Sequence, residues 1–283
     1  MILFSSSGRL GNQLFQYAGL KKYFPNHSFI FFGCEELLEC FDNVDVRFIR
    51  KDTIIRRVFS LLLNRIIFFL SNVGILGRIT EDSNSNRFSL IVQKGLSPGI
   101  FVPQNIYFQH FDVLDHIDNP PVLKPYLLEQ AMCWLQKKEI NSNNDSPVFV
   151  HIRRGDYLTW PSREFPAVLD LSWYKRAMDS IQEKISNPVF IFMGDDQNYL
   201  RNVFVESESL AISDNSPEID LALMSLCSSG ILSASSFAWW GALYSRTTKK
   251  NNAYFIAPKY WAGHRSKKWY PANFRTEWIN YIE

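Results

Sequence analysis

Short apolar runs alternate along the chain with longer segments that carry apolar residues at helical spacing. The apolar runs predict strands over residues 2–4, 29–32, 101–108, 148–152, 189–193 and 230–232. The other segments predict helices from about residue 12 and over residues 124–140, 172–185, 220–227 and 237–245. Strands that alternate with helices form parallel sheets with right-handed crossovers, so the pattern indicates an α/β fold.

A polar cluster at residues 141–147 divides this pattern into two halves. It reads Asn-Ser-Asn-Asn-Asp-Ser-Pro, a composition typical of loops and linkers, and a new strand begins directly after it. A chain of 283 residues is long enough for two modest domains that each bury a core. We therefore predict domains over residues 1–144 and 145–283.

Composition narrows the functional class. With 46% hydrophobic and 20% charged residues the chain is a folded globular protein, and a net charge of +2 with scattered basic residues gives no support for nucleic-acid binding. Four widely separated cysteines without metal-ligand spacing indicate buried, reduced thiols. No signal-peptide pattern opens the sequence. We therefore expect a cytoplasmic protein.

The segment 56–70 is apolar but interrupted by basic residues, and it is shorter than the about 20 apolar residues that span a bilayer. One interpretation is a helix packed inside the first domain. The other is a membrane-surface helix, whose arginines meet anionic lipid while its large apolar side chains insert. The residues concerned are Arg56, Arg57 and Arg65, with Phe59, Leu62, Leu63 and Phe69.

Residues 151–157, His-Ile-Arg-Arg-Gly-Asp-Tyr, leave the predicted strand 148–152. Ligands of open α/β sheets bind at the carboxyl ends of strands. A guanidinium binds phosphate oxygens through two parallel hydrogen bonds and stays charged when it is partly desolvated. We therefore predict that His151, Arg153 and Arg154 hold a diphosphate and stabilise charge on it as a bond to phosphate breaks. Two surface arginines beside a core histidine are the alternative.

Ser235 and Ser236 are expected at the N-terminus of a helix that follows a strand, where backbone N–H groups and hydroxyls bind phosphate oxygens. A serine at this position is also common for capping alone. For Trp239 and Trp240 we expect core packing of at least one indole.

Three segments make the chain similar to the bacterial galactoside α-1,2-fucosyltransferases of glycosyltransferase family 11. They are residues 8–18 (Gly-Arg-Leu-Gly-Asn-Gln-Leu-Phe-Gln-Tyr-Ala), residues 151–157 and residues 233–242 (Ser-Ala-Ser-Ser-Phe-Ala-Trp-Trp-Gly-Ala). They occur in the family's order and spacing and together span most of the chain. The resemblance implies a GT-B-type glycosyltransferase, in which the parallel sheets of two Rossmann-like domains face a cleft.

The resemblance also implies the reaction. It is an inverting, metal-independent transfer of L-fucose from GDP-β-L-fucose to the 2-hydroxyl of a terminal galactose, without a cofactor. The absence of an Asp-x-Asp motif fits arginines in place of a metal ion. The 145–283 domain would bind the GDP-sugar, and the 1–144 domain would bind the acceptor.

Roles for single residues follow from the same resemblance. Arg154 is the expected phosphate ligand, and Arg153 either joins it or supports the loop. An acidic residue near the position of Asp220 accepts hydrogen bonds from guanine in more distant fucosyltransferases, although Asp220 could equally stabilise the helix dipole. The remaining donor-binding residues are expected to be Ser235, Ser236 and Phe237, with Gly11, Asn12 and Gln13 from the first domain.

Inversion requires a group that accepts the proton of the attacking hydroxyl. Asp156 is the first candidate because it lies on the arginine loop, and Glu164 is the second. Asp156 could instead form an ion pair that orients Arg154.

The expected acceptor is a galactose-terminated, lipid-linked oligosaccharide of an O-antigen-like surface polysaccharide, at the cytoplasmic face of the inner membrane. Two alternatives stay open: another GDP-6-deoxy sugar such as GDP-colitose as the donor, or a non-catalytic glycan-binding module on the same fold.

Overall fold

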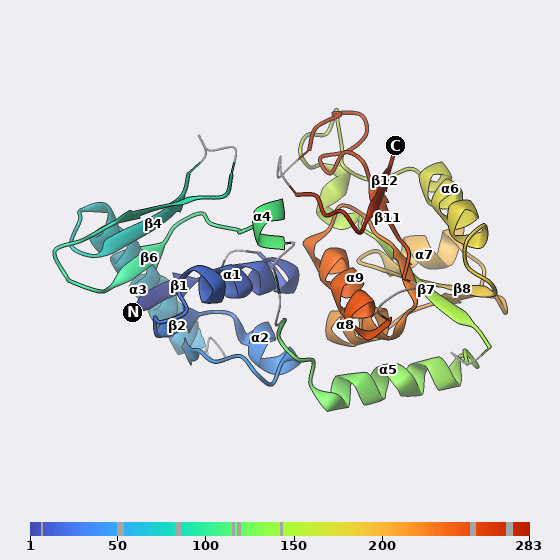
Figure 1. Ribbon diagram of the computed structural model, residues 1–283, viewed down its shortest axis with the longest axis horizontal. Helices are drawn as coiled ribbons and strands as arrows, with labels where there is room; N and C mark the ends of the chain where they lie inside the picture. The colour runs from blue at the N-terminus through green and yellow to red at the C-terminus, as the bar shows by residue number, and fades with distance from the viewer. Residues whose placement is uncertain are drawn as a thin grey trace. The chain divides into compact units, whose positions relative to one another are not determined.

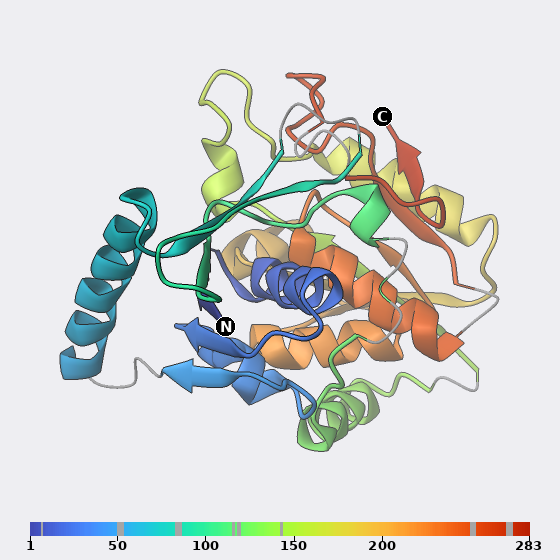
Figure 2. The ribbon, with the colours of Figure 1, turned by 60° about the vertical axis from the view of Figure 1, so that its left-hand side comes forward.

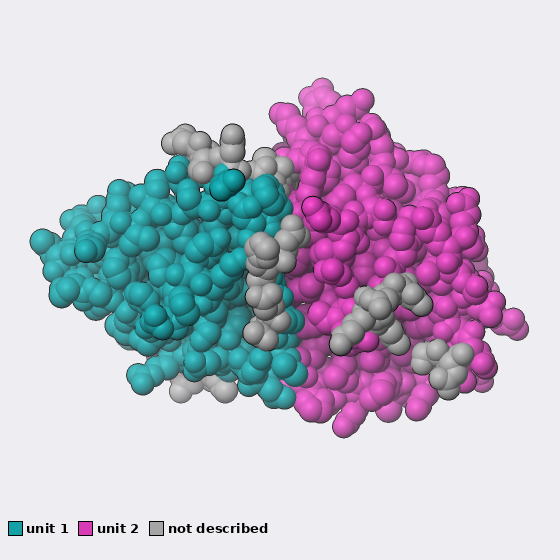
Figure 3. All heavy atoms as spheres, viewed as in Figure 1, with its two compact units in different colours: residues 1–122 teal, residues 123–283 magenta. Residues whose placement is uncertain are grey.

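The computed structural model describes residues 1–6, 8–49, 54–82, 87–114, 117, 120–141, 144–249, 253–269 and 274–283, except for the side chains of residues 54–57, 60 and 249. The chain forms two compact units, Met1–Val122 and Leu123–Glu283, which are coloured separately in Figure 3. Within the described residues, each unit is built around a six-stranded sheet flanked by helices (Figure 1). The α/β prediction is confirmed.

The strands of unit 1 lie in the order β3-β2-β1-β6-β4-β5, and all neighbours are parallel except β4 and β5. The described elements are β1 (Ile2–Ser5), α1 (Leu10–Tyr23), β2 (Phe29–Phe32), α2 (Glu35–Cys40), β3 (Arg47–Ile49), α3 (Ile54–Asn72), β4 (Gly77–Glu81), β5 (Leu90–Gln93), β6 (Phe101–Pro103) and α4 (Phe111–Leu114).

Alternation along the strands of unit 1 sends apolar residues to both faces of its sheet. On one face, Ile30 and Phe32 belong to a cluster that includes Ile67 of α3. On the other, Phe31 packs against Tyr17 of α1 with 6.3 Å between ring centroids. Helices α1 and α3 therefore cover opposite faces of this sheet.

The strands of unit 2 lie in the order β12-β11-β10-β7-β8-β9, and every neighbouring pair is parallel. The described elements are α5 (Pro125–Lys137), β7 (Ser146–Ile152), a 3₁₀ turn (Gly155–Leu158), α6 (Leu171–Gln182), β8 (Pro188–Gly194), α7 (Gln197–Val203), β9 (Leu210–Ile212), α8 (Pro217–Leu226), β10 (Ser229–Ile231), α9 (Ser236–Lys249), β11 (Phe255–Pro258) and β12 (Asn280–Ile282).

Long apolar strands in the middle of this sheet are buried on both faces, as expected for a parallel sheet. Val148 and Val150 of β7 pack in one cluster with Trp173 of α6. On the other face, α8 packs against α9, whose Trp239 and Trp240 are fully buried. The prediction of core packing is thus confirmed for both indoles.

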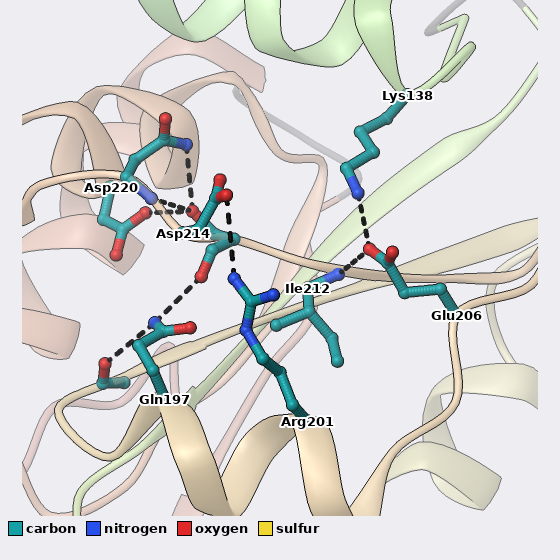
Figure 4. A network of polar contacts seen from close by, with 10 residues as sticks. Lys138, Gln197, Arg201, Glu206, Ile212, Asp214 and Asp220 are labelled. Atoms are coloured by element: carbon teal, nitrogen blue, oxygen red, sulfur yellow. Dashed lines mark hydrogen bonds and ion pairs between the residues drawn. The ribbon is translucent and has the colours of Figure 1, made fainter.

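The compact units divide one helix earlier than the polar cluster at 141–147 suggested, because α5 belongs with unit 2. Helix α5 packs against α8. Lys138, just after α5, forms an ion pair with Glu206 at 2.6 Å, and Glu206 also accepts a hydrogen bond from the backbone N–H of Ile212 (Figure 4). A polar loop therefore marks a break in secondary structure here, but not the limit of the packed unit.

Other sequence expectations also need correction. The strand that begins at Phe101 ends at Pro103 instead of continuing to residue 108, and α1 begins at Leu10 instead of Asn12. Among the described strands, the pattern did not predict β3, β4, β5, β9, β11 or β12; β4 and β5 form the antiparallel pair at one end of the unit 1 sheet. All four cysteines are free, but Cys133 is exposed because it lies on the outer side of α5.

Candidate functional site

The candidate site lies at the carboxyl ends of β7, β8 and β10. From β7 the chain continues through β8 and β9 on one side of the sheet and returns to β10 on the other. The neighbours β7 and β10 therefore form the topological switch point, where ligands of open α/β sheets bind. Helix α9 follows β10 in the chain and begins at Ser236.

His151 bridges the switch point and is buried. Its Nδ1 lies 2.7 Å from the Ser233 hydroxyl, and the Ser233 backbone N–H donates to the His151 carbonyl at 3.2 Å. Burial lowers the pKa of His151 to about 4, more than the nearby Asp195 raises it. The imidazole is consequently neutral at neutral pH, so it can exchange a hydrogen bond but supplies no positive charge.

Arg153 is held by two carboxylates. Its Nη2 lies 2.5 Å from Asp156 Oδ1, and its Nη1 lies 3.1 Å from Asp195 Oδ2. The guanidinium also lies over the Tyr157 ring, 5.6 Å from the centroid. Both ends of the guanidinium fork are therefore used within the protein, which favours loop support as the role of this arginine.

Arg154 is oriented differently. Its backbone N–H donates to Asp195 Oδ1 at 2.8 Å, its Nε donates to Asp196 Oδ2 at 3.2 Å, and its guanidinium lies 3.7 Å from the centroid of the Tyr199 ring. Within the part of the chain that the structure describes, Nη1 and Nη2 of Arg154 have no hydrogen-bond partner. Arg154 thus presents a fixed, unoccupied fork, the geometry that binds a phosphate.

Two glycines allow the ends of β7 and β8 to approach. A Cβ on Gly155 would lie 2.7 Å from Asp195 Oδ2, and a Cβ on Gly194 would lie 2.2 Å from the carbonyl oxygen of Ile152. Larger residues at these positions would displace the carboxylate that holds both arginines or push the two strands apart.

The turn between β10 and α9 lies beside the arginine loop. Ser235 precedes α9, and its carbonyl accepts the N–H of Trp239, so Ser235 occupies the N-cap position and Ser236 begins the helix. The ring of Phe237 lies 5.7 Å from that of His151. The Tyr157 hydroxyl donates to the Ala234 carbonyl at 2.5 Å, which ties the arginine loop to this turn.

Asp220 lies in the first turn of α8 and is buried. Its Oδ1 accepts a 2.5 Å hydrogen bond from Ser213, which follows β9. Burial raises the pKa of Asp220 to about 7; the Ser213 hydrogen bond opposes this shift, and Asp214 and Glu218 reinforce it. Figure 4 shows Asp220 in one polar network with Asp214 and Gln197, in which Gln197 donates to the Ser213 carbonyl at 2.9 Å. This carboxyl group changes charge near neutral pH.

The glycine-rich loop of unit 1 connects β1 to α1. Gly8 has φ +91°, in the left-handed region that glycine tolerates, and a Cβ there would lie 2.3 Å from Asn12 Nδ2. Gln13 donates to Glu36 Oε2 at 2.8 Å and to the Gly8 carbonyl at 3.3 Å, and Asn12 accepts from Gln109 at 2.9 Å. Both amide side chains therefore stabilise the loop, and Gly11 is buried in α1.

The two candidate bases have different surroundings. Asp156 is 61% exposed and pairs with Arg153, whereas the sequence had suggested Arg154 as its possible partner. Glu164 is exposed and has no partner among the described residues.

Sequence reasoning did not assign a role to three residues that shape this site. Asp195 and Asp196 follow β8 and hold the arginine loop, and Tyr199 of α7 supports the Arg154 guanidinium. The signal available in the sequence was Gly194-Asp195-Asp196 directly after an apolar run, because carboxylates at a strand end point to the same edge as the arginines.

The described part of the chain contains neither the pattern of a metal site nor that of a membrane-spanning helix. No group of three or more His, Cys, Asp or Glu side chains there could hold a metal ion. No described helix combines the length and apolar character needed to cross a membrane.

The chain is similar to known glycosyltransferases. The family model of glycosyl transferase family 11 matches residues 99–283. The chain is 28% identical to the O-antigen biosynthesis glycosyltransferase WbnK of Escherichia coli, over 93% of this chain and 95% of WbnK. It is 25% identical to an Escherichia coli alpha-1,2-colitosyltransferase, over 83% of this chain and 84% of that protein.

Animal proteins match a smaller part. The chain is 29% identical to galactoside 2-alpha-L-fucosyltransferase Sec1 of Mus musculus, over 51% of this chain and 42% of Sec1. Among solved structures, a glycosyl transferase family 9 protein of Veillonella parvula has a TM-score of 0.53 with 12% identity, over 99% of this chain and 85% of the other. This last similarity concerns the fold.

Proposed function

Because the chain belongs to glycosyl transferase family 11 and is therefore a glycosyltransferase, we propose that it transfers L-fucose from GDP-β-L-fucose to the 2-hydroxyl of a terminal galactose. The observation that carries the proposal is the Arg154 guanidinium at the topological switch point, whose Nη1 and Nη2 have no hydrogen-bond partner among the described residues. The similarity of the chain to a galactoside 2-alpha-L-fucosyltransferase supports the sugar and the linkage.

In the proposed reaction, the galactose hydroxyl attacks the anomeric carbon of fucose as the bond to the β-phosphate breaks. Negative charge develops on the departing GDP, and Arg154 stabilises it together with the N-terminus of α9 at Ser235 and Ser236. Neutral His151 adds a hydrogen bond, Arg153 holds the loop, and Phe237 lines the site. Gly11, Asn12 and Gln13 of unit 1 are proposed to complete the donor site.

The hydroxyl proton is proposed to pass to Asp156, with Glu164 as the other candidate. Asp156 has one carboxylate oxygen on Arg153 and is largely exposed, so it can accept a proton while the loop stays in place. Unit 1 is proposed to bind the acceptor and unit 2 to bind the GDP-sugar.

The proposed acceptor is a lipid-linked, galactose-terminated oligosaccharide of an O-antigen-like polysaccharide, modified at the cytoplasmic face of the inner membrane. The similarity to the O-antigen biosynthesis glycosyltransferase WbnK over nearly the whole chain supports an O-antigen-like acceptor. The similarity to an alpha-1,2-colitosyltransferase favours a second candidate, the same reaction with GDP-colitose as the donor.

The test is to incubate the purified protein with GDP-fucose or GDP-colitose and an array of galactose-terminated oligosaccharides. We expect GDP release and an α-1,2-linked product with GDP-fucose. Turnover with GDP-colitose alone would establish the second candidate. Glycan binding without GDP release from either donor would contradict both and indicate a non-catalytic module.

We expect excess EDTA to leave the transfer rate essentially unchanged. Arginines stabilise the leaving-group charge in the proposed mechanism, and the carboxylates beside them, Asp156, Asp195 and Asp196, are each paired with Arg153 or Arg154. Initial rates before and after chelation, with Mg²⁺ and Mn²⁺ added back, provide the measurement. A rate that is lost on chelation and restored only by one of these ions would contradict this part of the mechanism.

We expect GDP to bind more tightly as the pH rises through 7. Guanine offers two N–H donors, and an ionised Asp220 accepts them better than a protonated one does. Since the pKa of Asp220 is raised to about 7, affinity should increase roughly tenfold between about pH 6 and about pH 8.

Calorimetric titration of GDP at several pH values measures this effect. Asp220→Asn is the matched control because its amide keeps an oxygen acceptor for Ser213. Any pH dependence that comes from the phosphate of GDP is the same for wild type and variant, so the difference between them reports on Asp220. The variant should bind GDP about 1–3 kcal/mol more weakly at high pH and lose the additional pH dependence. Equal pH profiles would exclude Asp220 from guanine recognition.

A further inference from the structure

Helix α3 exposes a broad apolar face. Seven large apolar residues in and directly after the helix are each between 51% and 63% exposed: Val58, Phe59, Leu61, Leu62, Ile66, Phe69 and Val73. Soluble proteins rarely leave so many neighbouring apolar side chains in water unless the surface binds something. We call these seven residues the α3 outer face.

The opposite side of α3 is packed in unit 1. Ile67 is buried among residues of the sheet, with Leu63 and Leu70 beside it. Asn64 donates to the Ser5 hydroxyl at 3.0 Å, at the end of β1. Helix α3 is therefore held in unit 1 through one side, and the residues of the α3 outer face do not take part in the core. Figure 2 shows α3 at one side of the sheet of unit 1.

Helical geometry makes most of the outer face continuous. At 100° per residue, all of its residues except Leu61 fall in one stripe roughly 100° wide, and Arg65 lies between this stripe and Leu61. The stripe is wider than the narrow seam of a coiled coil, and an apolar face with basic residues beside it is the pattern of helices that lie in the membrane interface.

The apolar surface continues beyond the end of α3. The loop after β5 lies against the turn that follows the helix, because Leu96 N–H donates to the Gly74 carbonyl at 2.9 Å and Ser97 N–H donates to the Ile75 carbonyl at 2.8 Å. Leu96 is 83% exposed beside this turn. Two separate segments of unit 1 thus contribute to one apolar surface.

The charge of α3 indicates the kind of partner. Its sequence contains three arginines and no aspartate or glutamate. Arg65 is exposed, next to the apolar stripe, and forms no ion pair within the described part of the chain. Cationic residues that border an inserted apolar face are attracted by anionic lipid headgroups.

We propose that the α3 outer face docks this protein on an anionic lipid bilayer, with α3 lying in the interface and Arg65 at the headgroups. A second copy of the chain fits less well, because a two-fold contact through α3 would bring arginine-rich helices together without acidic partners. The proposal does not depend on which sugar is transferred, although such docking would bring the enzyme to a lipid-linked acceptor.

Vesicle flotation tests the proposal with the full-length protein. The vesicles are phosphatidylcholine alone or phosphatidylcholine mixed with phosphatidylglycerol. Wild type should float with the mixed vesicles and much less with the neutral ones. Leu62→Ser/Phe69→Ser should reduce flotation by about 10- to 100-fold, because two large apolar side chains no longer insert. Arg65→Gln should reduce it by about fivefold, and only with anionic vesicles.

The matched control is Met132→Ser/Val205→Ser, which removes two exposed apolar residues from unit 2 and should leave flotation unchanged. Transfer to a soluble acceptor should be the same in all variants, so a failed assignment of donor or acceptor cannot be mistaken for failed docking. Equal flotation of wild type and Leu62→Ser/Phe69→Ser would overturn the proposal. So would a wild-type dimer that the same substitutions convert to a monomer without any vesicle binding.

Discussion

Arg154→Lys should lower kcat by about 10²- to 10³-fold while the affinity for GDP falls much less. The reason is geometric: Nε of Arg154 is held by Asp196 and the guanidinium lies over the Tyr199 ring, so the two Nη atoms are held in one plane and can bind a phosphate together. A lysine ammonium keeps the charge but cannot form the paired hydrogen bonds or the stacking contact. Steady-state rates and GDP calorimetry on the same preparation measure the difference.

Arg201→Lys is the matched control. Arg201 also lies in α7, but its side chain is exposed. Among the described residues it pairs with Asp214, with 3.7 Å between Nη2 and Oδ2. This change should leave both kcat and GDP affinity unaltered. An unchanged kcat in Arg154→Lys would remove Arg154 from the proposed mechanism, and Arg153 would then be the remaining candidate ligand.

Asp195→Ala should lower kcat by about 10²-fold and destabilise the protein by roughly 1–3 kcal/mol. Asp195 holds the arginine loop at two points, the backbone N–H of Arg154 and Nη1 of Arg153. Without it the Arg154 fork loses its fixed position, although no group that contacts the donor has been removed. Chemical denaturation and steady-state kinetics together measure both effects.

Two related variants show whether Asp195 acts by positioning. Asp195→Asn keeps an acceptor for the Arg154 N–H but places an amide beside Arg153, so it should recover part of the lost kcat. Asp156→Asn weakens the other ion pair of Arg153. Because the Asp156 side chain is largely exposed, this variant should barely change the stability of the protein. If Asp156 is the base, this variant loses kcat with GDP binding preserved. Full activity in Asp195→Ala would show that the loop needs no such support.

Apolar periodicity was sufficient to predict the central strands β7, β8 and β10 of unit 2 and its helices α5, α6, α8 and α9, but not β9, α7, β11 or β12. Strands β7 and β8 are long, continuous apolar runs because both faces of a parallel sheet are buried, and such runs are visible without knowledge of their neighbours. The antiparallel pair β4 and β5 was missed. Strand β5 is four residues long at the sheet edge, where pairing with one neighbour decides the structure more than local pattern does.

The limits of the packed units depended on tertiary contacts. Helix α5 precedes the polar loop in sequence, yet its apolar side packs on α8 and Lys138 pairs with Glu206. The same reason applies to α3: its sequence fitted both a packed helix and a membrane-surface helix. Only the folded chain shows that one side is buried at Ile67 while the other is exposed.

For the site, the residue types that follow β7 and precede α9 can be read from the sequence, and they indicate an arginine loop beside a serine turn at one edge of a parallel sheet. How these residues differ depends on the folded chain. Asp156 and Asp195 occupy the Arg153 fork, whereas Arg154 keeps its fork open, and burial leaves His151 neutral. The orientation of the two arginines depends on partners that are distant in sequence, and the protonation of His151 depends on the exclusion of water. Both conditions arise only when the chain has folded.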